Sequence, residues 1–174
     1  NTPTILWARR ESLAAEINER QINSDYLAQF TLPVELRATS SLAEAVAHAD
    51  VLVMAVPSHG FRDVASAAAA HVRAWVPVVS LTKGLERNTL KRMSEVIRQE
   101  LKLDGERVAV ASGPNLALEI AKEQPTAAVV SSENLETATT VAITATNPYF
   151  RAFVNTDVIG TEFGGVLKNL IAVA

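Results

Sequence analysis

A lysine that follows two evenly spaced glycines makes residues 160–169 the part of the chain best suited to chemistry. Asp157 precedes this segment and can cap a helix that runs to the chain end, because a carboxylate accepts bonds from the free N–H groups of a first helical turn. On such a helix Gly160, Gly164 and Lys168 recur every four residues and share one face. We expect the missing side chains to let another backbone or a flat ligand approach closely. The alternative is a close helix–helix contact from which Lys168 extends to solvent.

Lys83 is the second candidate for chemistry. Thr82-Lys83-Gly84 directly follows the strand predicted at 76–81, and Gly84 permits a tight turn at that point. A solvated surface lysine is the alternative, but the position directly after a buried strand favours a functional role.

The elements that must position these lysines alternate between strand and helix. The run at 51–56 is continuously apolar, which is typical of a strand covered on both faces. The alternation predicts an α/β fold with a mostly parallel sheet. Strands are predicted at 4–8, 34–39, 51–56, 76–81, 108–111, 126–131 and 150–155. Helices are predicted at 11–20, after a cap at Ser40 or Ser41, at 61–72, from a cap at Asn88 to 101, up to 122, and at 135–146.

Ligands bind outside the carboxyl ends of parallel strands, so the residues directly after each strand matter most. These positions are small, polar or cationic and include few carboxylates, which favours a pocket for an anionic ligand. Arginines are also common surface charges at a helix start, and we interpret His59 as a solvated loop residue rather than a base. The positions are Arg9 and Arg10, Pro57-Ser58-His59, Thr82-Lys83-Gly84, Gly113-Pro114-Asn115 and the helix of Lys168.

Composition excludes several classes of function. The 174 residues have a net charge of −3, which argues against a nucleic-acid partner. The absence of cysteine excludes disulfides and thiolate metal sites, and no metal site is predicted. Neither a signal peptide nor an apolar run of membrane-spanning length is present in the sequence. We therefore expect a soluble cytoplasmic protein with no membrane insertion.

Five motifs occur in an order and spacing that resemble one enzyme family over the whole chain. The last three are specific as a set. Together they resemble bacterial NAD(P)-dependent glycerol-3-phosphate dehydrogenase, and the resemblance implies a Rossmann-like sheet. The motifs are Trp7-Ala8-Arg9-Arg10, Val56-Pro57-Ser58, Ser80-Leu81-Thr82-Lys83-Gly84-Leu85-Glu86, Ser112-Gly113-Pro114-Asn115-Leu116-Ala117-Leu118-Glu119 and Gly160-Thr161-Glu162-Phe163-Gly164-Gly165-Val166-Leu167-Lys168-Asn169.

The resemblance implies reversible reduction of dihydroxyacetone phosphate to sn-glycerol 3-phosphate by a nicotinamide cofactor, which supplies glycerol phosphate for phospholipid synthesis. Lys168 matches the catalytic lysine that protonates the ketone oxygen as hydride arrives. Lys83 matches a lysine that binds the substrate close to the cofactor.

The resemblance also assigns roles to smaller residues. Gly113, Asn115 and Asn169 match substrate-contacting positions, although a serine or threonine often replaces Asn115 in homologues. Pro57 and Ala117 match positions that line the cofactor pocket.

General chemistry agrees with these assignments. Hydride addition to a carbonyl creates an alkoxide, and an ammonium group beside it stabilises that charge as it develops. A lysine near a second lysine and partly desolvated has its pKa pushed downward, toward the range in which a general acid works best. Lys168 and Lys83 form such a pair if the fold brings them together.

The chain departs from the family at both ends. It begins at what should be the second strand, after the family's glycine-rich phosphate loop, and it stops before the large helical domain with further phosphate-binding residues. We therefore expect residues 1–156 to be a partial dinucleotide-binding domain and residues 157–174 to open a helical substrate domain. The missing strand belongs in the middle of the sheet, so two half-sheets with exposed edges are expected. The segment alone is expected to be inactive and only marginally stable.

Cofactor choice is predicted from the end of the first strand. An acid there usually binds the ribose 2′-hydroxyl of NAD, whereas arginine accommodates the 2′-phosphate of NADP. Here Arg9 and Arg10 follow the strand, and the first acid is Glu11. NADP is therefore favoured, with NAD as the alternative.

Two other functions stay open at the level of sequence. A related Rossmann reductase of a keto or hydroxy acid would share the sheet but need not share the two lysine motifs. A non-catalytic binding module would keep the fold without turnover. A homodimer is compatible with each of these functions.

Overall fold

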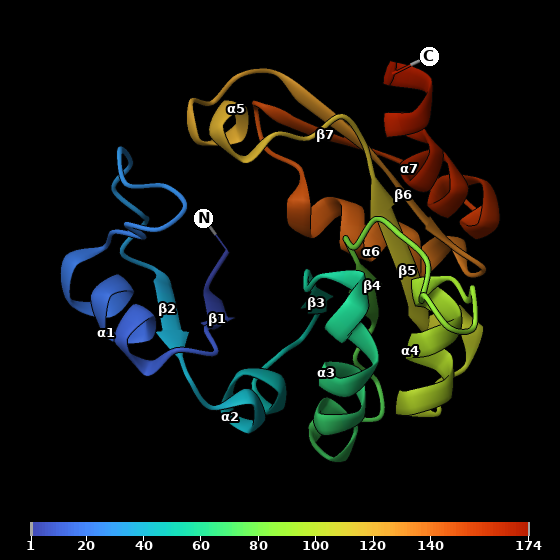
Figure 1. Ribbon diagram of the computed structural model, residues 1–174, viewed down its shortest axis with the longest axis horizontal. Helices are drawn as coiled ribbons and strands as arrows, with labels where there is room; N and C mark the ends of the chain where they lie inside the picture. Colours follow the sequence, from blue (N-terminus) through green and yellow to red (C-terminus); the bar gives the residue numbers. More distant parts are fainter. Residues whose placement is uncertain (1, 174) are drawn as a thin grey trace. The chain divides into compact units, whose positions relative to one another are not determined.

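The computed structural model describes residues 2–173, except for the side chains of residues 169–172 (Figure 1). The chain divides into two compact units. The first contains Asn1–Ala49 with His71–Arg73, and the second contains Asp50–Ala70 with Ala74–Ala174.

The first unit is a β-α-β-α segment. Strand β1 (Thr4–Trp7) lies parallel to β2 (Leu36–Thr39), and helix α1 (Glu11–Arg20) connects them. Helix α2 (Leu42–Ala47) follows, and Ser41 caps it as predicted by accepting a bond from the Glu44 N–H at 3.2 Å. This βαβ crossover is the expected route between two parallel strands.

The core of the first unit is aliphatic, with one polar contact at its edge. Ile17 of α1 is 1% exposed and packs with Ala8, Ala14 and Ala38. Asn18 of the same helix pairs with the backbone of Ala38. Its Nδ2 donates to the Ala38 carbonyl, and its Oδ1 accepts from the Ala38 N–H, both at 2.8 Å. The Asn18 amide therefore bonds the N–H and the carbonyl of Ala38, which no other strand bonds in the described structure.

The second unit is built on a five-stranded sheet. Its strands lie in the order β3 (Leu52–Met54), β4 (Val78–Ser80), β5 (Val108–Ser112), β6 (Thr126–Ser132) and β7 (Phe150–Asn155). Only the β5–β6 pair is antiparallel. The α/β fold and its mostly parallel sheet are therefore confirmed. The two predicted half-sheets are also confirmed, since β1 pairs only with β2 and β3 only with β4 among the described strands.

Helices cover both faces of this sheet (Figure 1). Helix α6 (Leu135–Ala145) buries Ala138, Val141 and Ala142 against Val79, Ala109 and Val130. Alternation along a strand puts Ser131 on the face opposite to Val130, and Ser131 contacts α7 (Val158–Val173). The remaining helices are α3 (Phe61–Ala68), α4 (Met93–Leu101), α5 (Ala117–Ala121) and the short 3₁₀ turns η1 (Ser58–Gly60), η2 (Ala69–His71) and η3 (Gly105–Arg107).

The predicted start of the helix that ends near residue 101 is wrong. Asn88 does not cap it. Helix α4 begins at Met93, after the N-cap residue Arg92. The preceding residues form a turn instead, in which the Glu86 N–H bonds the Lys91 carbonyl at 2.9 Å and Leu90 adopts a left-handed φ of 56°. Local hydrogen bonds of this turn compete successfully with helix formation.

Within the described residues, no helix is long and apolar enough to cross a membrane.

The turn after Lys83 is fixed by an ion pair between Glu86 and Arg62 of α3. Arg62 Nε donates to Glu86 Oε1 at 2.6 Å, and its second amino group donates to Oε2 at 2.9 Å. Thr89 also donates to this carboxylate. The Arg62 contacts, with the Thr89 bond, lower the pKa of Glu86 from an ordinary 4.5 to about 2. This two-pronged geometry is the strongest form of an arginine–carboxylate contact.

Because the folded-state pKa is lowered, the pair stabilises the fold at pH values above 4.5 and loses this contribution as pH falls toward about 2. We predict that Glu86→Gln lowers the free energy of unfolding at pH 7. The variant should also lose less stability than the parent between these two pH values. Urea unfolding from pH 2 to pH 7 measures both. Equal acid sensitivity in parent and variant would contradict the assignment.

Candidate functional site

The carboxyl ends of β3 and β4 are joined by side chains that position Lys83. Thr82 Oγ1 donates to the Val56 carbonyl at 2.7 Å, and the Thr82 N–H bonds Ser80 Oγ at 3.2 Å. Gly84 follows with φ = 140°, a conformation that favours glycine. A Cβ atom there would lie 3.1 Å from Ser58 Oγ. The predicted tight turn at Gly84 is therefore confirmed, and it directs the chain away after Lys83.

The two candidate lysines meet at this edge of the sheet. Lys83 Nζ donates to the Gly113 carbonyl at 2.7 Å. Partial burial lowers the pKa of Lys83, and the positive charge of neighbouring Lys168 lowers it further. Two lysines 85 positions apart in sequence are therefore neighbours, and the Gly113 carbonyl holds Lys83.

The close approach of α7 to the sheet occurs at Gly165, not at the two glycines singled out from the sequence. A Cβ atom at Gly165 would lie 2.6 Å from Ser112 Oγ and 3.5 Å from Lys83 Cγ. At Gly164 it would meet no described atom within 4 Å, and at Gly160 it would meet only the carboxylate of Asp157. The expected close approach of another backbone at Gly160 and Gly164 is therefore wrong, because Gly165 faces the sheet. The approach of a flat ligand there stays a prediction.

The predicted cap of α7 is confirmed. Asp157 Oδ1 accepts the Gly160 N–H at 2.8 Å, and the Asp157 N–H bonds Asn155 Oδ1 at 3.0 Å. Asn155 also bonds Ser131, which in turn contacts Thr161 at 2.6 Å. The first turns of α7 are thus fastened to β6 and β7.

The turn after β5 places Gly113 and Asn115 near Lys83. A Cβ atom at Gly113 would lie 2.5 Å from the Ala127 carbonyl, so the neighbouring strand requires glycine. Asn115 Oδ1 is buried and has no hydrogen-bond partner among the described atoms. Buried polar atoms are normally bonded, so this oxygen is suited to a ligand. Ala117 begins α5 and is exposed.

A hollow of about 370 Å³ opens beside Lys83. Half of its lining residues are apolar and half are polar or charged. The predicted cofactor residue Pro57 is part of the wall, and so is His59. The lining residues are Ala55, Val56, Pro57, Ser58, His59, Leu81, Thr82 and Lys83.

Arg9 and Arg10 belong to the first unit, directly after β1. Both are exposed. Arg10 is the N-cap residue of α1, and its guanidinium pairs with Asp25, which raises the pKa of Arg10. The predicted substrate residue Asn169 lies outside the residues whose side chains are described.

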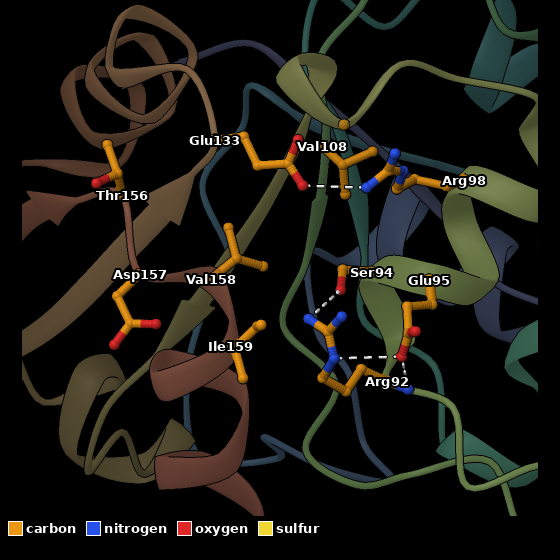
Figure 2. Close-up of a pocket in the computed structure, with 11 residues that line it drawn as sticks. Arg92, Ser94, Glu95, Arg98, Val108, Glu133, Thr156, Asp157, Val158 and Ile159 are labelled. Atoms are coloured by element: carbon orange, nitrogen blue, oxygen red, sulfur yellow. Dashed lines mark hydrogen bonds and ion pairs between the residues drawn. The ribbon is translucent and has the colours of Figure 1, made fainter.

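Sequence reasoning missed a second hollow, of about 180 Å³, at the start of α7 (Figure 2). Arg92, Ser94 and Glu95 of the α4 start line it, with Asp157 and Val158 on the other side. Lys168 is ten residues further along α7, about 15 Å at 1.5 Å per residue. The hollow is therefore separate from the lysine pair. No spacing in the sequence indicated that the α4 start would meet α7.

Comparison with known proteins identifies the family. The family model described as NAD-dependent glycerol-3-phosphate dehydrogenase N-terminus matches residues 1–138. The chain belongs to this family. A glycerol-3-phosphate dehydrogenase for NAD(P)+ from Leifsonia xyli subsp. xyli is 59% identical over 98% of the chain and 46% of the relative. One from Sphingopyxis alaskensis is 50% identical over 100% of the chain and 52% of the relative. The chain thus spans about half the length of these curated relatives.

Solved structures agree with this family assignment. The glycerol-3-phosphate dehydrogenase of Coxiella burnetii matches with a TM-score of 0.87 at 29% identity, over 97% of this chain and 51% of that one. The Dunaliella salina enzyme matches with a TM-score of 0.87 at 32% identity, over 97% of this chain and 30% of that one. A pyrroline-5-carboxylate reductase from Coxiella burnetii, at 12% identity and a TM-score of 0.66, shares the fold alone. The predicted family resemblance is confirmed.

The two adjacent glycines of α7 provide a matched test of the packing. We predict that Gly165→Ala destabilises the chain by about 1–3 kcal/mol, because the new methyl group collides with Ser112. Gly164→Ala should be neutral or stabilising by up to about 1 kcal/mol, since alanine favours a helix and the space is open. Equilibrium urea unfolding of both variants measures the difference. Equal effects of the two substitutions would show that Gly165 is not the contact point.

Proposed function

We propose that this chain is part of an oxidoreductase that reversibly reduces dihydroxyacetone phosphate to sn-glycerol 3-phosphate, with NADP preferred over NAD. The product would supply phospholipid synthesis. The observation that supports this most is the Lys83–Lys168 pair at the carboxyl ends of the strands, with the lowered pKa of Lys83. The names of the relatives from Leifsonia xyli and Sphingopyxis alaskensis support the same reaction.

In this proposal Lys168 is the acid–base group. A bound nicotinamide cofactor would supply the hydride. As that hydride adds to the carbonyl carbon, the C=O π electrons move to oxygen and the Lys168 ammonium gives a proton to it. The neutral amine takes the proton back in the reverse direction. An ammonium beside the developing alkoxide lowers the barrier because its charge is already in position.

Lys83 binds and orients the substrate in the same scheme. One N–H of its ammonium is held by the Gly113 carbonyl at 2.7 Å, which leaves two for substrate oxygens. Asn115 Oδ1, buried without a partner among the described atoms, would accept from a substrate hydroxyl. Asn169 stays a predicted substrate contact.

Cofactor-binding residues are proposed in each unit separately. The hollow beside Lys83, with Pro57 in its wall, would take the nicotinamide half, and Ala117 stays a predicted contact. Arg9 and Arg10 would bind the 2′-phosphate. Because Arg10 already pairs with Asp25, we expect Arg9 to contribute more.

The larger organisation is also a proposal. Residues 1–156 would form the cofactor domain, and residues 157–174 would begin a helical substrate domain of a longer cytoplasmic protein. A homodimer is compatible with it. Two alternatives, a reductase of another keto or hydroxy acid and a non-catalytic module, predict no turnover of dihydroxyacetone phosphate.

The test of Lys168 uses a chimaera in which residues 1–174 replace the matching part of the Leifsonia xyli relative. We predict that Lys168→Ala lowers kcat for dihydroxyacetone phosphate about 10²–10⁴-fold, as for loss of a general acid. The cofactor Kd should hardly change. Lys102→Ala, at an exposed lysine that ends α4, is the control. A near-normal kcat in the Lys168 variant would remove this residue from the mechanism. An inactive parent chimaera would contradict the proposed reaction.

Cofactor preference is tested in the same chimaera. Replacing Arg9 and Arg10 by glutamine should weaken NADPH binding more than NADH binding, because only NADPH carries the 2′-phosphate. The single Arg9 variant should show most of this effect. Fluorescence titration with both cofactors gives the four Kd values needed. Equal losses for NADPH and NADH would rule out the 2′-phosphate assignment.

A further inference from the structure

Glu162 of α7 is a buried carboxylate that has no role in the proposed reaction and none assigned from the family's motifs. Its side chain is only 8% exposed. Oε1 accepts the Ser94 N–H at 2.9 Å. Oε2 accepts from the Ser94 hydroxyl at 2.6 Å and from the Arg92 guanidinium at 3.0 Å. All three donors belong to the start of α4, so this carboxylate fastens one helix to the first turn of another.

These contacts are more extensive than a simple surface ion pair. Burial of a carboxylate is costly unless both of its oxygens are hydrogen-bonded. Here a backbone N–H, a hydroxyl and a guanidinium share the two oxygens of Glu162. The backbone N–H is one of the free donors of the first turn of α4, which favour a negative charge. The carboxylate is therefore held in one orientation.

The position of Glu162 on α7 decides what its anchoring controls. Thr161, Gly165 and Lys168 are spaced by four and three residues, so they share the helix face that meets the sheet. Thr161 contacts Ser131, and Gly165 packs on Ser112, which together set the height of α7 above the sheet. Glu162 projects about 100° away around the axis. A contact at that angle prevents rotation of the helix.

A small rotation would matter for Lys168. With side chains at about 5–6 Å from a helix axis, a turn of about 10° moves a side-chain tip by about 1 Å. A displacement of this size in a catalytic group can lower a rate by about 10²-fold.

We propose that Glu162 is a positioning residue, which sets the rotation of α7 through the start of α4 and so keeps Lys168 beside Lys83. The effect on activity rests on the proposed function, whereas the effect on the lysine pair does not. Glu162 touches neither lysine in this role. It acts through the helix that carries Lys168.

The chain contains a matched control for this proposal. Arg92 has a second carboxylate partner, Glu95, whose Oε2 lies 3.2 Å from Arg92 Nε and accepts the Arg92 N–H at 2.9 Å (Figure 2). These two contacts stay within α4 and its N-cap. Glu95→Gln therefore weakens the environment of Arg92 without releasing α7, whereas Glu162→Gln and Glu162→Ala weaken or remove the link between the helices.

The first measurement reads the lysine pair directly. The pH dependence of Lys83 acetylation by acetic anhydride, followed by mass spectrometry, gives the pKa of Lys83 with no need for activity. Because Lys168 lowers that pKa, its displacement should raise the value toward the ordinary 10.5. Lys168→Ala sets the upper limit of the rise. We expect Glu162→Ala to raise the pKa part of the way to this limit, Glu162→Gln to give a smaller rise, and Glu95→Gln to match the parent.

The second measurement is kinetic and uses the chimaera. Glu162→Ala should lower kcat by about tenfold to hundredfold and leave the cofactor Kd within about twofold of the parent. If Glu162→Ala does not fold, as judged by its thermal melt, Glu162→Gln decides both measurements.

Two results would overturn the proposal. One is an unchanged Lys83 pKa in the folded Glu162 variants. The other is an equal rise in Glu95→Gln, which would make Arg92 rather than α7 the cause. If the parent chimaera does not reduce dihydroxyacetone phosphate, the proposed function fails, but the acetylation profiles still decide the role of Glu162.

Discussion

Two positive charges are held together at the edge of the sheet, and most of the described architecture around them can be understood as a response to that repulsion. Lys83 and Lys168 would separate if their segments were free to move, because like charges at short range in partly desolvated surroundings repel strongly. Each segment is instead held in place by an ion pair outside the lysine pair. Glu86 fastens the turn after Lys83 to Arg62, and Glu162 fastens α7 to the start of α4. The Gly113 carbonyl gives Lys83 a partial negative charge to face.

The two anchors share one physical logic. In both, a carboxylate is bound by an arginine and by a hydroxyl, from Thr89 in one case and from Ser94 in the other. Neither carboxylate belongs to the lysine pair itself. A negative charge placed directly between the lysines would neutralise the positive field that would attract the proposed anionic substrate. Anchors that lie away from the two lysines leave their positive field intact and still fix the segments that carry them.

The sequence predicted those parts of the fold that depend on residues close together in the chain. Apolar runs predicted the strands, Gly84 predicted the turn, and Asp157 predicted the helix cap. One failure was local. Asn88 is a good cap by type, but the Glu86 N–H bonds the Lys91 carbonyl, and that segment forms a turn instead of a helix start. The other failures occurred where distant contacts decide. Gly165 could not be separated from Gly164 without knowledge of which side of α7 meets Ser112. The partnership of Glu162 with Ser94 joins residues 68 positions apart, and no spacing rule reaches that far.

Asn18 closes one side of the first unit. Its amide presents the same donor and acceptor as a peptide group, and it occupies the Ala38 backbone on the edge of β2 that faces away from β1. A neighbouring chain that tried to add a strand there would find its docking positions already filled. At Ala38, addition of a strand to this edge of β2 would require the Asn18 amide to give up both bonds. One amide side chain thus makes the two edges of the small sheet unequal for the addition of a further strand.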